Sequence, residues 1–357
     1  MKTRIDKSTS LGPVKTTDVG SAASDLKIGV IGYGYWGPNI VRNFHGAAGA
    51  TVACVCDNRA QALDSLHKNY PDMNTTQEYR DIIQATDIDV VAVVTPVSTH
   101  YGLAKKALLE GKHVFVEKPF TATVAEAEEL INIAEQKNLK IMVDHTFLFT
   151  GAVRKIKTLI SEGVLGDVYY YDSTRVNLGL FQHDANVIWD LAPHDFSIMR
   201  YVIDEKPVAI SAHGKAHVGE YENIAYIAVH FANNLIAHFN VNWLSPVKLR
   251  NTLIGGEKKM LVWNDVDPDE KIKIYDKGID VKNREGVYKM LVSYRTGDMT
   301  APKIEPTEAL RLETEHFVDC IVNDKTPISD ATLGLEVVQM LEACDKSIKD
   351  EGRLVRL

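Results

Sequence analysis

The 357-residue chain has little of the positive charge that marks nucleic-acid-binding proteins. Lysine and arginine together number 40, against 48 aspartates and glutamates, which leaves a formal net charge of −8. This balance argues against a surface that coats nucleic acid, so we expect no nucleic-acid partner. Local groups must then hold any anionic ligand.

Cysteine and long apolar runs are also scarce. The four cysteines, Cys54, Cys56, Cys320 and Cys344, form no CxxC pair, which predicts reduced thiols in a cytoplasmic protein. No apolar run is long enough to cross a bilayer, and residues 1–25 lack the apolar centre of a signal peptide. We therefore expect a soluble protein with no membrane partner. The polar, non-periodic composition of residues 1–25 predicts a disordered tail.

Short continuous apolar runs begin at Leu26 and alternate with helical patterns. The clearest helix follows Thr123-x-x-Glu126, a capping box. Continuous apolar runs are typical of strands that are buried on both faces of a parallel sheet. The first half therefore predicts an α/β, doubly wound Rossmann domain over residues 26–146. The expected strands are Leu26 to Ile31, Val52 to Asp57, Val90 to Thr95, His113 to Glu117, and Lys140 to Asp144.

The pattern changes in the second half. Strands there alternate apolar and polar residues, and Asn233-Asn234 separates two of them as a hairpin turn would. We expect residues 147–357 to form an α+β domain in which these strands pair antiparallel.

Three glycines form a GxGxxG motif between a predicted strand and a predicted helix. Gly32 suits the tight turn, Gly34 the close approach of a pyrophosphate, and Gly37 the packing of helix on sheet. Asp57 ends the next strand, where a carboxylate would bind an adenosine ribose and repel a 2′-phosphate. The motif predicts NAD as cofactor, with NADP less favoured.

Two further groups carry chemistry. Lys118 follows Glu117 at the carboxyl end of a strand, at the sheet edge where open α/β sheets bind ligands. Asp190 and His194 are four residues apart, so a helix would place the carboxylate where it can orient the imidazole. Asp190–His194 and His316–Cys320 each lack a third and fourth ligand nearby, so we expect no metal site.

The motifs GYGYWG at 32–37, EKP at 117–119 and DxxxH at 190–194, with Asp57 between them, occur in this order over nearly the whole chain from Leu26. Together they resemble the glucose-fructose oxidoreductase/inositol dehydrogenase (Gfo/Idh/MocA) family. The resemblance implies hydride transfer between nicotinamide and a sugar carbinol carbon. It also implies that residues 147–357 form an open, largely antiparallel sheet that holds the substrate and mediates oligomerisation, as a homodimer or homotetramer. It also implies that Lys118 and His194 are the catalytic pair and that Asp190 is the orienting carboxylate. The cofactor contacts expected are Gly32, Tyr33, Gly34, Tyr35, Trp36, Gly37, Asp57, Asn58, Thr95, Pro96, His100, Glu117 and Lys118.

One departure from the family concerns the substrate. Many members carry a glycine-rich run before the catalytic aspartate, whereas this chain has Asn186 to Trp189. The WDLAPHD form resembles the branch of UDP-N-acetylglucosamine 3-dehydrogenases, which implies a nucleotide-sugar substrate. Lys118, Asp190 and His194 would contact that substrate, and Arg175 and Asn177 would meet its phosphates from one face of a strand. The alternatives are a free sugar or inositol dehydrogenase, a non-redox enzyme with transient NAD oxidation, and a non-catalytic NAD-binding regulator.

Overall fold

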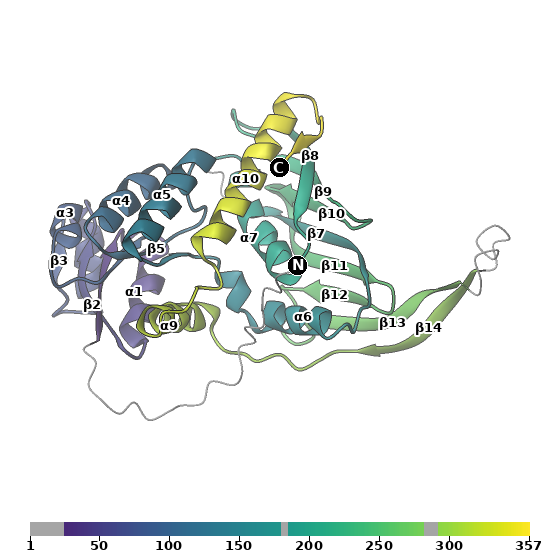
Figure 1. Ribbon diagram of the computed structural model, residues 1–357, viewed down its shortest axis with the longest axis horizontal. Helices are drawn as coiled ribbons and strands as arrows, with labels where there is room; N and C mark the ends of the chain where they lie inside the picture. Colours follow the sequence, from purple (N-terminus) through teal and green to yellow (C-terminus); the bar gives the residue numbers. More distant parts are fainter. Residues whose placement is uncertain (1–24, 180–184, 282–291) are drawn as a thin grey trace, which may run out of the picture.

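The computed structural model describes residues 25–179, 185–281 and 292–357 (Figure 1). The tail expected over residues 1–25 lies outside this part except for its last residue. The first half is a six-stranded parallel sheet in the order β3-β2-β1-β4-β5-β6. The order reverses between β1 and β4, which is the switch point where such sheets bind ligands. The strands are β1 (Leu26–Ile31), β2 (Ala50–Cys56), β3 (Thr75–Thr76), β4 (Val90–Val93), β5 (His113–Val116) and β6 (Ile141–Val143).

Helices connect these strands as the sequence predicted. α5 begins with the expected capping box, in which the Thr123 side chain accepts from the Glu126 backbone and the Glu126 side chain accepts from Thr123. It ends at Asn138, which has the left-handed conformation common at helix ends. The helices are α1 (Gly37–Gly46), α2 (Ala60–His67), α3 (Tyr79–Ile83), α4 (Val97–Leu109) and α5 (Val124–Lys137).

The second half is built on a nine-stranded sheet in the order β14-β13-β12-β11-β7-β10-β9-β8-β15. β7 and β10 are parallel, and the other neighbours are antiparallel, including the β9–β10 hairpin expected at Asn233-Asn234. This confirms the predicted α/β fold with a second, open sheet. The strands are β7 (Val168–Leu178), β8 (Pro207–Lys215), β9 (Ile224–Phe231), β10 (Ile236–Asn242), β11 (Leu244–Gly256), β12 (Met260–Asn264), β13 (Ile272–Val281), β14 (Val292–Thr300) and β15 (Val355–Arg356).

The helices of the second half lie along one side of this sheet and along the boundary with the first half. α7 packs on β10, and α10 packs on β8. None of the described helices is long and apolar enough to cross a bilayer. The helical elements are η1 (Thr146–Phe149), α6 (Gly151–Ser161), α7 (Val187–Val202), α9 (Ala309–Val322) and α10 (Ala331–Lys349).

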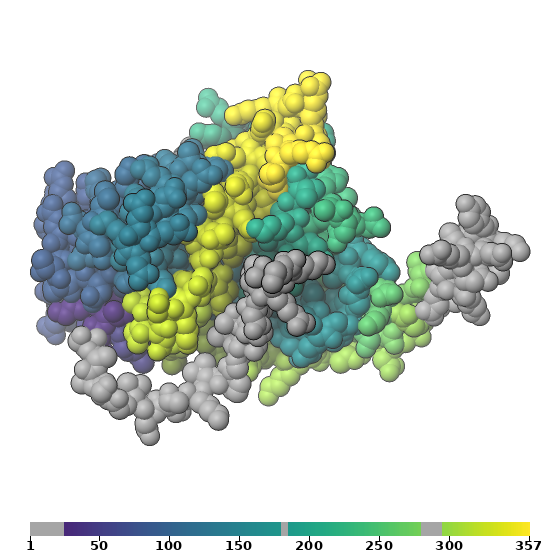
Figure 2. All heavy atoms as spheres, viewed as in Figure 1, coloured from purple at the N-terminus to yellow at the C-terminus, as the bar shows by residue number. Residues whose placement is uncertain are grey.

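The last two helices join the two halves. α10 contacts α5 and β6 on one side and α7 and β8 on the other, and α9 contacts α1. An ion pair between Arg42 on α1 and Glu308 before α9 lies at this contact. Figure 2 shows the C-terminal segment, in yellow, filling the seam between the blue and green parts of the chain. A division at residue 147 remains a prediction, because these contacts tie the end of the chain to both halves.

Candidate active site

The three glycines of the motif have the geometry that a dinucleotide cradle requires. Gly32 has φ 105°, and a Cβ there would lie 2.1 Å from the Val94 carbonyl oxygen. A Cβ on Gly37 would lie 2.7 Å from the Gly32 carbonyl oxygen, so this glycine lets α1 pack against the turn. Gly34 is different, since the nearest atom to its Cβ position would be Arg59 Nη2 at 3.8 Å. The space above Gly34 is therefore open to the cavity, where a pyrophosphate would approach the backbone.

The N-terminus of α1 faces the same cavity. Its N-cap residue, Trp36, provides no side-chain acceptor, and Pro38 lies in the first turn. The positive end of the helix dipole is thus left for an anion. With the open cradle at Gly34, this arrangement fits the pyrophosphate of NAD.

Asp57 follows β2, lines the cavity and is 7% exposed. Its Oδ2 accepts from the Tyr33 backbone nitrogen at 2.8 Å and from Arg59 Nη2 at 2.9 Å. Its Oδ1 accepts from the backbone nitrogen and from Nε of Arg59, both at 2.9 Å. Burial alone would raise the pKa of Asp57, but the hydrogen bonds from Arg59 outweigh it and lower that pKa. The carboxylate is ionised and its four acceptor positions are occupied, so a ribose hydroxyl would displace the Arg59 side chain, which is 61% exposed.

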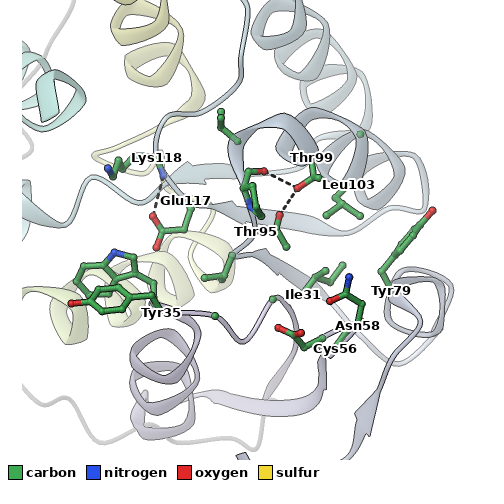
Figure 3. A pocket seen from close by; sticks show the side chains of 18 of the residues that line it. Ile31, Tyr35, Cys56, Asn58, Tyr79, Thr95, Thr99, Leu103, Glu117 and Lys118 are labelled. Carbon is green, nitrogen blue, oxygen red and sulfur yellow. Dashed lines mark hydrogen bonds between the residues drawn. The ribbon is translucent and has the colours of Figure 1, made fainter. Parts of the chain in front are cut away.

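The cavity has a volume of about 1310 Å³ and runs along the carboxyl ends of the strands. Figure 3 shows Asn58 and Tyr79 at one end and Glu117 and Lys118 at the other. Of the cofactor contacts that the sequence predicts, these residues line it: Gly32, Gly34, Tyr35, Trp36, Asp57, Asn58, Thr95, Pro96, Glu117 and Lys118.

Lys118 reaches from β5 to the N-terminal turn of α7. Its Nζ donates to the Asp190 carbonyl oxygen at 3.0 Å and lies 3.7 Å from Asp190 Oδ1. The other carboxylate oxygen of Asp190 accepts from Trp243 Nε1 at 3.1 Å. Asn186 is the N-cap of α7, and its side chain accepts from two backbone nitrogens of the first turn. Asp190 is therefore free to anchor the lysine.

His194 also lines the cavity, one turn further along α7. The centre of its ring lies 5.0 Å from that of Phe147 in an edge-on arrangement, and its Nδ1 is buried with no hydrogen-bond partner among the described residues. Burial lowers its pKa, and the positive charges of Lys118 and Arg175 lower it further. The imidazole is consequently neutral near pH 7 and able to accept a proton.

The expected orientation of His194 by Asp190 is not what the structure shows. The two residues share no hydrogen bond, because the Asp190 carboxylate faces Trp243 and Lys118. Helical spacing places both side chains on one side of α7, but it does not decide which neighbour each one meets.

Five other predicted site residues do not line the described cavity, and one of them, Gly37, instead lets α1 pack against the turn. Arg175 is 4% exposed, and Asp195 holds its guanidinium through bonds of 2.7 and 3.1 Å, so it is a buried ion pair where a phosphate contact was expected. Asn177, on the same strand, also lies away from the cavity. His100 is fully buried between the carbonyl oxygens of Thr95 and Pro119, so it supports the cavity wall from behind. The Tyr33 side chain is also buried, although its backbone holds Asp57.

Several lining residues are absent from the sequence-based prediction. Tyr79 and Lys106 line the end near Asp57, and Trp189 lies beside Asp190. No short-range pattern marks Tyr79 and Lys106, because they come from α3 and α4 and meet only in the folded chain, whereas Trp189 opens the WDLAPHD motif. Nζ of Lys106 lies 5.3 Å from the centre of the Tyr79 ring.

Among the described residues, no cluster of three histidine, cysteine or acidic side chains has the arrangement of a metal site.

Comparisons with known proteins agree with this geometry. Residues 26–145 match the oxidoreductase family with an NAD-binding Rossmann fold (GFO_IDH_MocA), and residues 153–262 match the C-terminal domain of the same family. The chain belongs to this family. It is an NAD-binding oxidoreductase.

Two curated relatives span most of the chain. The scyllo-inositol 2-dehydrogenase (NAD(+)) of Bacillus subtilis is 25% identical, with 87% of this chain and 90% of that protein covered. The UDP-N-acetylglucosamine 3-dehydrogenase of Acidithiobacillus ferrooxidans is 26% identical, with 88% and 94% covered. A solved structure of the latter superposes with a TM-score of 0.77 at 21% identity, covering 92% of this chain and 99% of that one. That structure supports the fold alone, and the two relatives are equally distant in sequence.

Proposed function

We propose that the protein is a dehydrogenase that interconverts a sugar alcohol carbon and its ketone. The observation that carries this proposal is the convergence of the glycine cradle, Lys118 and His194 on one cavity. When bound, NAD would accept or return the hydride at its nicotinamide ring. The protein would supply the position and the proton transfer.

His194 acts in this proposal as the general base. Its neutral ring takes the hydroxyl proton as the carbon becomes a carbonyl, a role worth about 10²–10⁴ in rate. Lys118 stabilises the negative charge that develops on the oxygen, by about 3 kcal/mol for a typical oxyanion donor. Asp190 holds the lysine in place, because it meets both the ammonium and Trp243.

For the substrate we favour a nucleotide sugar related to UDP-N-acetylglucosamine, oxidised at its 3-position. The surroundings of His194 are positive, with Lys118, Arg175 and Arg250 all acting on its pKa. Arg175 is neutralised by Asp195, but the Arg250 side chain is 35% exposed and only loosely paired with Asp265 at 3.3 Å. Arg250 does not line the described cavity either, but its charge is less fully neutralised than that of Arg175, so we assign the phosphate contact to Arg250. Free inositol is the second candidate, because the relative from Bacillus subtilis is named for it.

The test compares the two substrates directly. UDP-N-acetylglucosamine with NAD should give NADH and should protect the protein against thermal unfolding, since a ligand at 100 times its Kd adds about 2.7 kcal/mol. Arg250→Ala should raise KM for this substrate, whereas Arg311→Ala, on the exposed face of α9, should leave it unchanged. Equal turnover of scyllo-inositol would replace the nucleotide sugar by the free polyol. Product formation without NADH would instead indicate transient oxidation, and no product would indicate a binding protein.

Three smaller proposals accompany this one. We expect NAD to be preferred to NADP, because the ionised Asp57 repels a 2′-phosphate. We also expect a homodimer or homotetramer, because the face of the large sheet opposite α7 exposes Tyr226, Ile236 and Leu253. The four unpaired cysteines suit a cytoplasmic, reducing compartment.

A further inference from the structure

Three buried acidic side chains meet behind the catalytic lysine. Glu117 follows β5, Asp144 follows β6, and Glu313 comes from α9, which is far away in the sequence. They are 8%, 4% and 0% exposed. Carboxylates are rarely buried without cationic partners, since three charges in one place would repel each other strongly. The proposed mechanism uses none of the three.

The hydrogen bonds of this cluster imply shared protons. Oε2 of Glu117 accepts from the Lys118 backbone nitrogen at 3.2 Å, and Oδ1 of Asp144 accepts from Thr146. The remaining Glu117 oxygen and both Glu313 oxygens meet no N–H or O–H donor in the described residues. Glu117 and Asp144 directly follow Val116 and Val143, which are paired on the neighbouring strands β5 and β6, and Glu313 lies on α9, which packs on η1 just after Asp144. Three carboxyl groups buried this close together cannot all be ionised, so they must hold at least one proton between them.

The charged groups around the cluster do not neutralise the three carboxyl groups in place of a shared proton. The lysine side chain beside Glu117 is Lys118, which is already engaged by Asp190. His145, the next residue after Asp144, is buried, and neither ring nitrogen has a partner in the described ranges. Burial lowers the pKa of His145 to about 3, so its imidazole is neutral.

Within the described residues, the elements around α9 supply no counterion to Glu313. The hydroxyl of Thr146 on η1 donates to Asp144, and the acidic groups facing Glu313 are Asp144 and Glu117. Arg42 of α1 pairs with Glu308 instead. Burial and the neighbouring Asp144 raise the pKa of both Glu117 and Glu313.

Glu117 links this cluster to the cofactor. It lines the cavity beside Lys118, at the end opposite to Asn58 and Tyr79 (Figure 3). If the adenosine lies near Asp57, an extended dinucleotide places its nicotinamide ring near Glu117. That ring is positively charged in NAD⁺ and neutral in NADH.

We propose that Glu117, Asp144 and Glu313 form a proton-sharing cluster that releases a proton when NAD⁺ binds and retains it when NADH binds. This inference rests on the proposed position of the nicotinamide. When NAD⁺ binds, the O–H bond of one carboxyl group in the cluster breaks, and its proton leaves through Glu117 to water in the cavity. The cluster thereby gains one negative charge. That charge compensates the nicotinamide cation and makes protonation of the nearby His194 less costly.

Calorimetric titration of the full-length protein tests this proposal. NAD⁺ and NADH are each titrated at one pH in three buffers that differ in ionisation enthalpy, because the slope of the heat against that enthalpy counts the protons exchanged. We expect about one more proton to be released with NAD⁺ than with NADH. The Kd for NAD⁺ should therefore fall by up to about tenfold for each unit by which the pH is raised. Binding of both forms with equal proton counts would overturn the cluster alone. Absence of binding heat for both would overturn the proposed function and the cluster with it.

Glu313→Gln identifies the source of the proton. Glu313 does not line the described cavity, and the amide of glutamine can donate to Asp144 without a titrating proton. We expect the NAD⁺-specific release to fall by at least about half. Glu315→Gln is the matched control, because Glu315 lies on the same helix and pairs with Arg311 at the surface. Full release in Glu313→Gln would overturn the cluster and assign the proton to Lys118.

Discussion

The two ends of the cavity differ in how their polar groups are satisfied. At the end near β2, the Asp57 carboxylate receives four hydrogen bonds, three of them from Arg59. At the other end, His194 Nδ1, both nitrogens of His145 and one oxygen of Glu117 are buried and have no partner in the part of the chain that the structure describes. An unsatisfied buried polar group costs about 1–3 kcal/mol. Under the proposed function, the end near Asp57 would serve binding, while the end near His194 would keep the polar groups that proton transfer requires.

The largest expected effect comes from the unsatisfied end. Lys118→Ala and His194→Ala should each lower kcat by about 10²–10⁴-fold. The Kd for NAD should stay nearly unchanged, since neither side chain belongs to the cradle or to the Asp57 end. Asp190→Asn should do less harm, because its amide oxygen can still face Trp243.

Lys105→Ala is the control for these variants, because Lys105 pairs with Glu129 at the surface of α4. Steady-state kinetics and cofactor titration on the same preparations separate the two quantities. Wild-type kcat in both alanine variants would end the catalytic assignment.

A second effect concerns stability against pH. His100 and His145 are buried and His194 is half-buried, and the loss of hydration lowers the pKa of each imidazole. The unfolded chain then binds more protons than the folded chain below pH about 6.5, so this contribution to stability is full above that pH and is lost as the pH falls. For His145 the loss between pH 6.5 and 5 is about 2 kcal/mol. The raised pKa values of Glu117 and Glu313 act in the opposite direction, because those groups stabilise the fold below their folded pKa.

The contributions of the histidines and of the two glutamates to the pH dependence of stability oppose each other. The useful measurement is therefore the difference between wild type and a variant that lacks one of these groups. The free energy of unfolding is measured by denaturant titration for the wild type and for His145→Gln, at about pH 7 and at about pH 5, which lies roughly 1.5 units below the ordinary pKa of histidine. The difference between the two proteins gives the contribution of the His145 imidazole alone. The variant should lose less stability on acidification. An equal loss in both proteins would mean that His145 is not held neutral.

The smallest expected effect lies at the satisfied end. Arg59→Ala should free two acceptor positions of Asp57 for the ribose and remove the one guanidinium that touches this carboxylate. The ratio of kcat/KM for NAD over NADP should rise by up to about fivefold, as expected for an exposed pair worth about 1 kcal/mol or less. Asp57→Ser should narrow the same ratio. A wild-type protein that used NADP as well as NAD would show that Arg59, and not Asp57, governs the choice.

The same contrast explains which parts of the site could be predicted. The glycine motif, the strand-end Asp57 and the capping box at Thr123 each depend on neighbours within a few residues, so spacing alone reveals them. Arg175 shows the limit of this reasoning. Alternation along β7 predicted one face for it, but the buried partner, Asp195, comes from α7 and neutralises the charge.

The sequence by itself determined the class of fold, the cofactor cradle and the catalytic candidates, because local periodicity and backbone requirements leave few alternatives there. Only the tertiary structure decided which groups face each other. Trp243, directly after β10, takes the carboxylate of Asp190, and Glu313 on α9 comes to lie near Asp144 across a separation longer than the whole Rossmann domain. Such contacts are set by the packing of distant elements, and no spacing along the chain encodes them.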